Sequence, residues 1–258
     1  MNFYISAFLL ALCLVPLGFG IFISMRIFNI PDITTDGSYT LGAALTAVLL
    51  TQNVSFLIAL PLVLFAGAGA GALTGIIHTR LKVSALLSGI LVMTALYSIN
   101  LMLMGRSNIP LMQVESVFSV LTFSQDENLN RIFVLLCFVF FVSIFLIWLL
   151  KTDFGIAMRA TGSNETMVRA QGINPVKMKI IGLAISNALV ALSGFLVAQL
   201  QGFSDINMGI GIVILGLGAV MIGESLLTSN LKSTLSWRLI SVILGTIIFR
   251  SILAFALS

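Results

Sequence analysis

The sequence has little of the charge that a water-soluble protein carries. Only 9% of its 258 residues are charged, compared with about 25% in average soluble domains, whereas 59% are apolar. The mean hydropathy of +1.15 agrees with this imbalance. Such a composition excludes a soluble globule, and its apolar content excludes a disordered chain. It predicts one polytopic membrane domain over residues 1–258.

Reactive and metal-binding side chains are also scarce. Cys13 and Cys137 both lie inside apolar runs, which excludes a disulfide scaffold, and His78 is the only histidine. The net charge of +4 is small and dispersed, so no nucleic-acid partner is expected. In a membrane protein, such an excess is more typical of cytoplasmic loops. We therefore predict no catalytic residue, no metal site and no directly bound cofactor.

Long apolar runs dominate what remains. A bilayer core of about 30 Å requires about 20 apolar helical residues. Two shorter runs, 39–51 and 208–223, follow polar stretches and are interpreted as interrupted spans. The first long run lacks a basic start and a small-residue cleavage site, which favours an uncleaved helix over a signal peptide. The fold class is thus predicted as an all-α polytopic membrane protein with about eight transmembrane helices, two of them interrupted. The long runs are 4–25, 56–77, 83–104, 132–150, 179–200 and 239–257.

Lysine and arginine set the expected orientation, because short cytoplasmic loops are enriched in them. The segment 151–179 carries five basic residues and is assigned to the cytoplasm. Counting spans outward from it places both chain termini outside. The segment 105–131, on the outer side, offsets its two arginines with three acidic residues. The region 26–40 leaves an alternative open, because the chain could dip into the membrane there without crossing it.

The two interrupted spans begin after polar breaks in the apolar sequence. In the first break, Pro31 ends a helix or forces extended backbone before it, and Asp36 or Ser38 suits the N-cap of a new helix. In the second, Asp205 or Asn207 suits the N-cap of the run 208–223.

Irregular backbone at membrane depth survives only where protein buries it or where it lines a cavity. A pair of interrupted spans, one in each half of a chain, therefore indicates a transport site and would fit an inverted repeat. The alternative is that both breaks are ordinary loops. Polar residues near the outer end of the run 83–104 either line the same pathway or serve as interfacial anchors and interhelix hydrogen bonds. The predicted substrate pathway comprises Asp36, Ser38, Tyr39, Thr40, Tyr97, Asn100, Asp205 and Asn207.

Other features inside the spans have a packing interpretation. Gly67, Gly69, Gly71 and Gly75 form a small-residue face that allows close helix approach. Asn187 requires a partner inside the bundle, and packing is its expected role.

The longest polar stretch on the predicted inner side is 151–178. Ser163 or Asn164 suits the N-cap of a short helix, and Gly172 suits its C-terminal end. Asn174 and Pro175 then suit the start of the next span. Two short helices joined by glycine turns make a rigid protrusion that suits docking onto another protein. A solvated connector is the simpler alternative.

At this loop the sequence resembles the permease subunits of ABC importers of the branched-chain amino acid and ribose type. Residues 31–42 and 96–105 resemble a subgroup paired with binding lipoproteins suspected of taking up aromatic amino acids. The loop residues that carry the resemblance are Phe154-Gly155, Arg159-Ala160, Asn164, Ala170 and Gly172-Ile173, followed by Ser186 and Ser193-Gly194.

The resemblance implies a transport subunit of the bacterial cytoplasmic (inner) membrane that forms the path for a small polar solute, expected to be an amino acid. It further implies a homodimer of two permease copies, separate ATP-binding cassette ATPases that use the ATP, an extracytoplasmic substrate-binding protein and surrounding lipid. In that family the loop seats in the ATPase. The implied coupling residues are Arg159, Gly162, Asn164, Glu165, Arg169, Gly172 and Ile173.

One departure from the family concerns the C-terminus, since members usually continue through a further helix beyond the position of Ser258. The chain also lacks a Gly-x-x-x-x-Gly-Lys-Ser/Thr pattern, so it is not expected to power transport itself. The alternatives are an ion-driven secondary transporter, for which Asp36 and Asp205 would be the candidate ion ligands, and an inactive shortened permease or scaffold. An intramembrane enzyme has no supporting residues.

Overall fold

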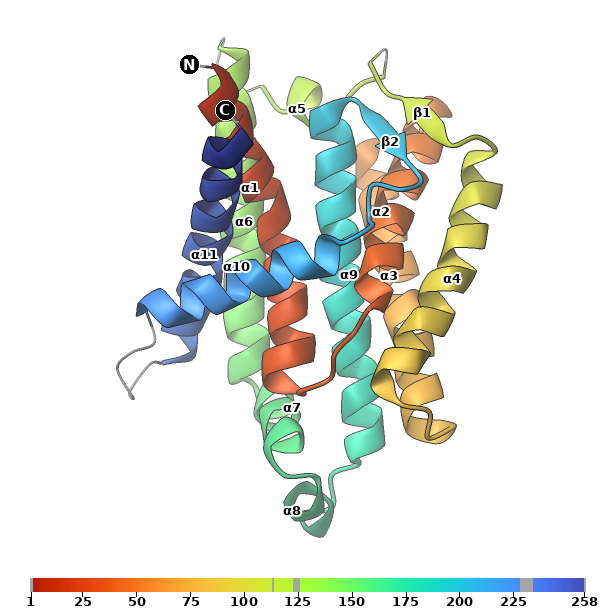
Figure 1. Cartoon of the computed structure of the whole chain (residues 1–258), viewed down its shortest axis with the longest axis vertical. Coiled ribbons are helices and arrows are strands. Elements are labelled where there is room, and N and C mark those ends of the chain that lie inside the picture. The colour runs from red at the N-terminus through yellow and green to blue at the C-terminus, as the bar shows by residue number, and fades with distance from the viewer. Residues whose placement is uncertain (1, 113, 123–125, 228–233, 258) are drawn as a thin grey trace.

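The structure, a computed structural model, describes all residues except 1, 113, 123–125, 228–233 and 258. Its long helices run alternately between the two ends of one bundle, whereas α10 lies across it; both termini lie at the end opposite a small protrusion made by α7 and α8 (Figure 1). The spanning helices are α1 (Asn2–Ile21), α3 (Phe56–Arg80), α4 (Ala85–Met104), α6 (Glu127–Lys151), α9 (Pro175–Gln201) and α11 (Leu235–Leu257). The shorter elements are the π-helix η1 (Phe22–Ile27), α2 (Thr34–Thr51), β1 (Asn108–Pro110), α5 (Val117–Val120), α7 (Asp153–Ser163), α8 (Glu165–Ala170), β2 (Phe203–Asp205) and α10 (Ile212–Leu227).

The predicted fold class, an all-α polytopic membrane protein, is confirmed. Six helices of the described chain are long and apolar enough to span a membrane, and they correspond to the six long apolar runs. The other two runs form α2 and α10. Both cysteines are free, as expected. The only strands among the described residues are β1 and β2, which pair at the end of the bundle opposite α7 and α8 (Figure 1).

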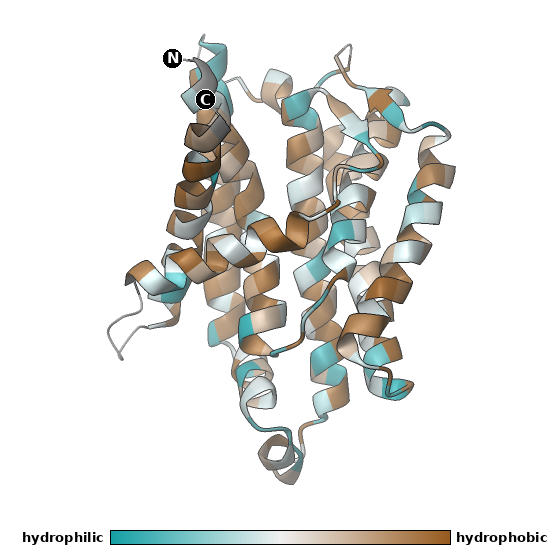
Figure 2. Cartoon of the chain, viewed as in Figure 1, coloured by the Kyte–Doolittle hydropathy of each residue, from teal (hydrophilic) through white to brown (hydrophobic). Residues whose placement is uncertain are grey.

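Two of the spanning helices form the centre of the bundle. The most apolar window of α1 is 83% buried and that of α9 is 72% buried, whereas the values for α3, α4, α6 and α11 lie between 22% and 33%. The outer helices therefore present apolar side chains outward, as helices in contact with lipid do. Figure 2 shows hydrophobic residues along the helices and hydrophilic ones mainly at the two ends of the bundle.

The chain order α1–α2–α3 is mirrored by α9–α10–α11. The short helix α2 and the following α3 both pack on α9, and the short helix α10 and the following α11 both pack on α1. In Figure 1, α2 enters the bundle from the end that carries α7 and α8, and α10 enters from the opposite end. This is the arrangement expected of the inverted repeat, in which each half supplies the packing surface of the other.

Glycines permit the closest of these contacts. A Cβ atom on Gly71 would overlap the Leu183 carbonyl of α9, and one on Gly67 or Gly75 would crowd the same helix. Gly69 has no atom within 4 Å of a Cβ position, so its place in the predicted packing face is wrong. A four-residue spacing keeps side chains on one face of a helix, and Gly69 falls between those turns.

The predicted starts of both short helices are wrong. Helix α2 begins at Thr34, ahead of Asp36 and Ser38, and Ile33 occupies the N-cap position without a side-chain hydrogen bond. Helix α10 begins at Ile212, beyond Asp205 and Asn207. The physical reason is that Asp32 accepts from the Thr34 N–H at the start of α2, and Asp36 of α2 accepts from N–H groups at the start of α10.

Candidate substrate pathway and coupling surface

A buried polar network holds the segment that leads into α2. Asp32 accepts hydrogen bonds from the Thr34 N–H at 2.9 Å and from Asn187 Nδ2 at 2.7 Å. Asn187 Oδ1 in turn accepts from Ser38 Oγ at 2.7 Å. All four residues are at most 1% exposed. Buried polar groups need such partners, so the network fixes the start of α2 against α9.

Further hydrogen bonds tie α2 to its other neighbours. Thr34 Oγ1 lies 2.7 Å from Thr74 Oγ1 of α3, and Asn100 Nδ2 of α4 donates to the Gly37 carbonyl at 3.3 Å. Asn100 is 1% exposed, and its Oδ1 has no hydrogen-bond partner among the described residues. Asn100 therefore forms the interhelix hydrogen bond considered for it, and its Oδ1 atom remains a buried acceptor without a partner among the described residues.

Asp36 reaches from α2 to the start of α10. Its carboxylate accepts from the Gly211 N–H at 3.0 Å and from the Val213 N–H at 2.9 Å. The first N–H groups of a helix have no intrahelical partner, and the helix dipole favours negative charge there. Asp36 also lies in the first turn of α2, so one carboxylate stabilises the N-terminal ends of both short helices.

The structure brings together only part of the predicted pathway. Thr40 lies with Asp36 beside Gly209, where an added Cβ atom would overlap both residues, whereas Ser38 faces Asn187 on α9. Tyr39 is 2% exposed and belongs to the apolar core around α1.

The remaining predicted residues lie elsewhere. Tyr97 is 48% exposed on α4. Asp205 belongs to β2, where its carboxylate accepts from Asn108 Nδ2 at 3.4 Å and from the Asn207 N–H at 2.8 Å. Asp205 and Asn207 therefore shape the end of the bundle around β1 and β2, ahead of the start of α10.

Sequence reasoning missed Asp32. Its signal was present, because a carboxylate directly after Pro31 in a break between apolar runs has to be paired if that break is buried. Local pattern reasoning assigned the capping role to Asp36 and Ser38 instead. Those two residues already lie inside a helix that starts at Thr34, so neither can be its N-cap.

The protrusion formed by α7 and α8 follows the sequence prediction closely. Asn164 is the N-cap of α8 and accepts from the Met167 N–H at 3.1 Å. Gly172 follows α8 with φ of +81°, a left-handed conformation that glycine adopts without strain. Asn174 caps α9, and Pro175 occupies its first turn. Glu165 of α8 forms an ion pair with Lys179 of α9, which fixes the protrusion to the bundle.

Five of the seven predicted coupling residues line two hollows at this end, and Asn164 and Glu165 line neither. Arg169, Gly172 and Ile173 line a hollow of about 380 Å³ beside α8. Arg159 and Gly162 line a second, polar hollow of about 390 Å³. Arg159, Asn164 and Arg169 are exposed, so their side chains are accessible to another protein at the tip of the bundle.

A set of close contacts links this protrusion to the segment that leads into α2. Asn29 Nδ2 donates to the Gly162 carbonyl at 3.4 Å, and a Cβ on Gly162 would overlap the Ile27 carbonyl. The ring of Phe28 covers Gly182 of α9 in the same way. These contacts connect α7 and α9 with residues 27–29, which precede Asp32 in the chain.

The chain matches a known family along nearly its whole length. The family described as "Branched-chain amino acid transport system / permease component" matches residues 3–256. No solved structure matches the chain.

Individual relatives agree with this assignment. The chain is 42% identical over 258 residues to the "Tyrosine transport system permease protein" of Clostridioides difficile, covering 100% of this chain and 84% of the relative. It is 23% identical over 219 residues to the "Ribose import permease protein RbsC" of Escherichia coli, covering 84% of this chain and 66% of the relative. It is 28% identical over 201 residues to the "Probable branched-chain amino acid transport permease protein LivH" of Methanocaldococcus jannaschii, covering 73% and 63%. The chain therefore belongs to the branched-chain amino acid permease family, and it is a multi-pass membrane permease subunit of an ABC importer.

Proposed function

We propose that the permease imports an aromatic amino acid of the tyrosine class. The observation that carries the proposal is the 42% identity along the whole chain to a permease named for tyrosine transport. A second copy of the chain would complete the path. An extracytoplasmic binding protein would deliver the solute at the end that carries β1 and β2, and separate ATPases would hydrolyse the ATP.

The start of α10 is the proposed recognition point for the solute carboxylate. Helix N-termini favour anions, and the N–H groups of Gly211 and Val213 donate hydrogen bonds to the Asp36 carboxylate in this structure. An incoming carboxylate would compete with Asp36 for these donors. Binding of the solute would then release α10 from α2 in the same step.

The proposed coupling route starts at α8. Closure of the ATPase pair would move the α7–α8 protrusion, and Gly162 would pass that motion to Ile27 and Asn29. The segment that contains Ile27 and Asn29 continues to Asp32, which is hydrogen-bonded to Asn187 on α9. The motion would therefore arrive at the base of α2, from which Asp36 reaches α10.

Reconstitution tests both the proposed solute and the proposed energy source of transport. The permease is purified from its native membrane under mild detergent, and the co-purifying subunits are identified and returned with it to liposomes. We expect an ATPase and a binding protein in the preparation. We also expect ATP-dependent uptake of radiolabelled tyrosine, and unlabelled phenylalanine should inhibit this uptake more strongly than leucine or ribose does. Uptake that is driven by an ion gradient without any ATPase would contradict the proposal and favour a secondary transporter.

Gly172→Val tests the docking of α8. Valine is strained at a φ of +81°, so the turn after α8 should be distorted while the membrane-spanning helices stay intact. We expect ATP hydrolysis to persist and uptake to be lost. Gly105→Val is the matched control, because Gly105 has φ of +63°, also has open space around it and follows α4 at the opposite end of the bundle. Equal losses of uptake in both variants would contradict the docking role.

A further inference from the structure

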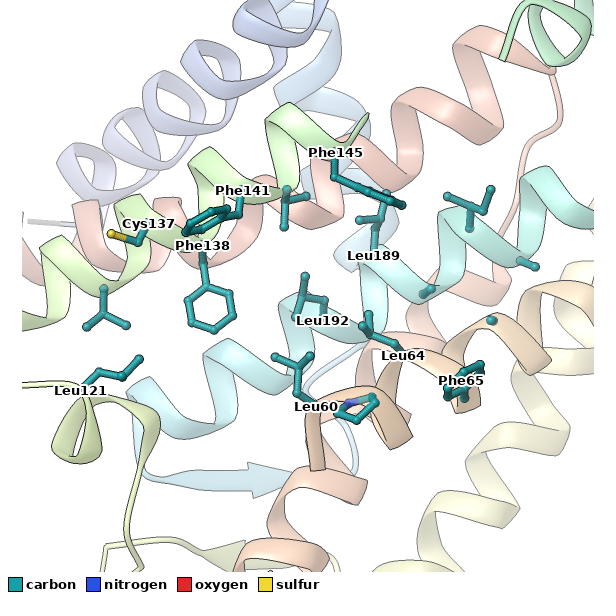
Figure 3. Close-up of a pocket in the computed structure, with 17 residues that line it drawn as sticks. Leu60, Leu64, Phe65, Leu121, Cys137, Phe138, Phe141, Phe145, Leu189 and Leu192 are labelled. Carbon is teal, nitrogen blue, oxygen red and sulfur yellow. The ribbon is translucent and has the colours of Figure 1, made fainter. Parts of the chain in front are cut away.

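Two hollows of the structure have contrasting linings. The first lies between α3, α6 and α9, has a volume of about 780 Å³ and is apolar, with Phe138 and Phe141 on one side and Leu60 and Leu64 on the other (Figure 3). The second, of about 390 Å³, has walls from η1, α7 and the start of α11, and we call it the arginine pocket. Only the arginine pocket carries charged groups from which the chemical class of a ligand follows.

Positively charged and hydrogen-bonding side chains line the arginine pocket. They are the guanidinium groups of Arg26, Arg159 and Arg238, the amide of Asn29 and the hydroxyl of Ser163. No carboxylate of the described residues lines it, and Glu224, the ion-pair partner of Arg26, lies outside the lining. Like charges around one hollow repel one another, so an anion between them is stabilising. A guanidinium has five N–H donors that match phosphate oxygens in pairs, so Arg26 can keep Glu224 and still bind an anion.

The two tryptophans of the chain indicate the depth of the arginine pocket in the membrane. Trp148 lies in the last turn of α6 and is 63% exposed, and Trp237 lies in the first turn of α11 and is 54% exposed. Exposed tryptophans gather where the hydrocarbon meets the headgroups. Because Trp237 directly precedes Arg238 on an outer helix of the bundle, the pocket lies at headgroup level within reach of lipid. On the orientation predicted from the basic residues, this is the inner leaflet.

We propose that the arginine pocket binds the phosphate of an anionic phospholipid of the inner leaflet. Basic pockets at the cytoplasmic end of membrane helices recognise headgroups through this chemistry. Phe22, Ile27 and Leu235 complete the lining and suit the glycerol and the first carbons of the acyl chains. An acidic side chain of an ATPase would offer similar oxygens, but the proposed docking element α8 forms the tip of the protrusion, farther from the spanning helices (Figure 1).

The bound headgroup would join three elements of the chain. Arg159 belongs to α7, Arg26 to η1 and Arg238 to α11. Gly162 and Ile27, whose close contact links α7 to η1, line the same pocket. An anionic lipid in the arginine pocket therefore stabilises the junction between the protrusion and the bundle, whatever solute the permease carries.

Lipid titration of the full-length permease tests the site without a transport assay. Phosphatidylglycerol or phosphatidylcholine is added to the delipidated protein in detergent, and bound lipid is counted by native mass spectrometry. We expect tighter binding of phosphatidylglycerol, which has a net negative charge, and about fivefold weaker binding of it after Arg238→Gln. Arg80→Gln is the matched control, because Arg80 is an exposed arginine at the same end of the bundle outside the pocket, and the affinity should not change. Equal affinities for the two lipids, or equal losses in the two variants, would overturn the site.

Competition separates the lipid from other sources of the same anionic oxygens. Millimolar inorganic phosphate has these oxygens without acyl chains, and we expect it to displace little phosphatidylglycerol. Full displacement would show a site for a soluble anion and overturn the assignment to lipid. Loss of the bound lipid when the ATPase subunits are added would assign the arginine pocket to the ATPase and would overturn it as well.

Thermal unfolding in nanodiscs tests the proposed effect on the junction. Phosphatidylglycerol should raise the unfolding temperature above that in phosphatidylcholine for the unaltered protein and for Arg80→Gln, and the rise should be smaller for Arg238→Gln. A rise that is equal in all three proteins would contradict a role for the arginine pocket. If Arg238→Gln does not fold, the lipid preference and the phosphate competition of the unaltered protein still decide the question.

Discussion

The two short helices α2 and α10 occupy corresponding places in the inverted repeat, yet the chain holds them very differently. Helix α2 is buried nearly all round, and hydrogen bonds reach it from α3, α4 and α9. Helix α10 is buried on one face only, through Ile212, Gly216, Ala219, Val220 and Gly223. Its opposite face carries Ile214, which is 73% exposed.

The ends of α10 depend on few side chains. Asp36 holds its start, and Arg26 of η1 forms an ion pair with Glu224 near its other end. Both Asp36 and Arg26 belong to the first half of the repeat. Hydrogen bonds therefore hold α2 on several sides, whereas α10 is held by its packing on α11 and by a few polar contacts at its ends. We interpret α2 as the anchor of the path and α10 as its moving part.

The largest effect is expected at the anchor. Asp32→Ala leaves the Thr34 N–H and one donor of Asn187 without an acceptor in a buried site. Each unsatisfied buried group costs about 1–3 kcal/mol, so we expect a loss of roughly 3 kcal/mol or more and little folded protein. Thermal unfolding in detergent, followed by size-exclusion chromatography, measures this loss. Glu115→Ala, at an exposed loop residue, is the control and should unfold like the unaltered protein.

A smaller effect on stability is expected at the start of α10. Asp36→Ala removes the acceptor of the Gly211 and Val213 N–H groups, and loss of a helix cap costs about 0.5–2 kcal/mol. The protein should fold, but α10 should no longer be held to α2. We expect ATP hydrolysis to rise in the absence of solute while coupled uptake falls.

Asp36→Asn refines this test. Its amide oxygen can accept only one of the two N–H donors well, so it should fall between the unaltered protein and Asp36→Ala in both measurements. If Asp36→Ala unfolds as readily as Asp32→Ala, the distinction between an anchored and a released half-helix fails.

Much of the fold was predictable because membrane spans are local features of composition. Six spans, two interrupted helices and their alternating course follow from runs of apolar residues whose length the bilayer sets. The caps of α8 and α9 were predicted correctly for the same reason. Asn164 and Asn174 bind N–H groups two or three residues further along the chain, so the signal lies within one turn.

The candidate site was less predictable because its decisive contacts join residues far apart in the sequence. Asp36 caps α10 through the N–H of Val213, 177 residues further along the chain, and Asp32 is paired with Asn187 across the bundle. No local pattern records which carboxylate reaches which helix end. The sequence could indicate only that polar side chains in the two breaks had to find buried partners.

The smallest effect is expected at the other end of α10. The side chain of Arg26 is 48% exposed and that of Glu224 is 18% exposed, and ion pairs of this kind contribute about 0–1 kcal/mol. Arg26→Gln alone should therefore change the unfolding temperature little. In the Asp36→Ala background, Arg26→Gln removes a second polar contact of α10, so we expect a loss of coupled uptake greater than the sum of the single losses. The exchange Arg26→Glu with Glu224→Arg restores the opposite charges. In the Asp36→Ala background, it should return uptake to the level of Asp36→Ala alone. Strict additivity of the two variants would mean that α10 is held by its apolar face alone, and the role of the polar contacts as its release points would have to be abandoned.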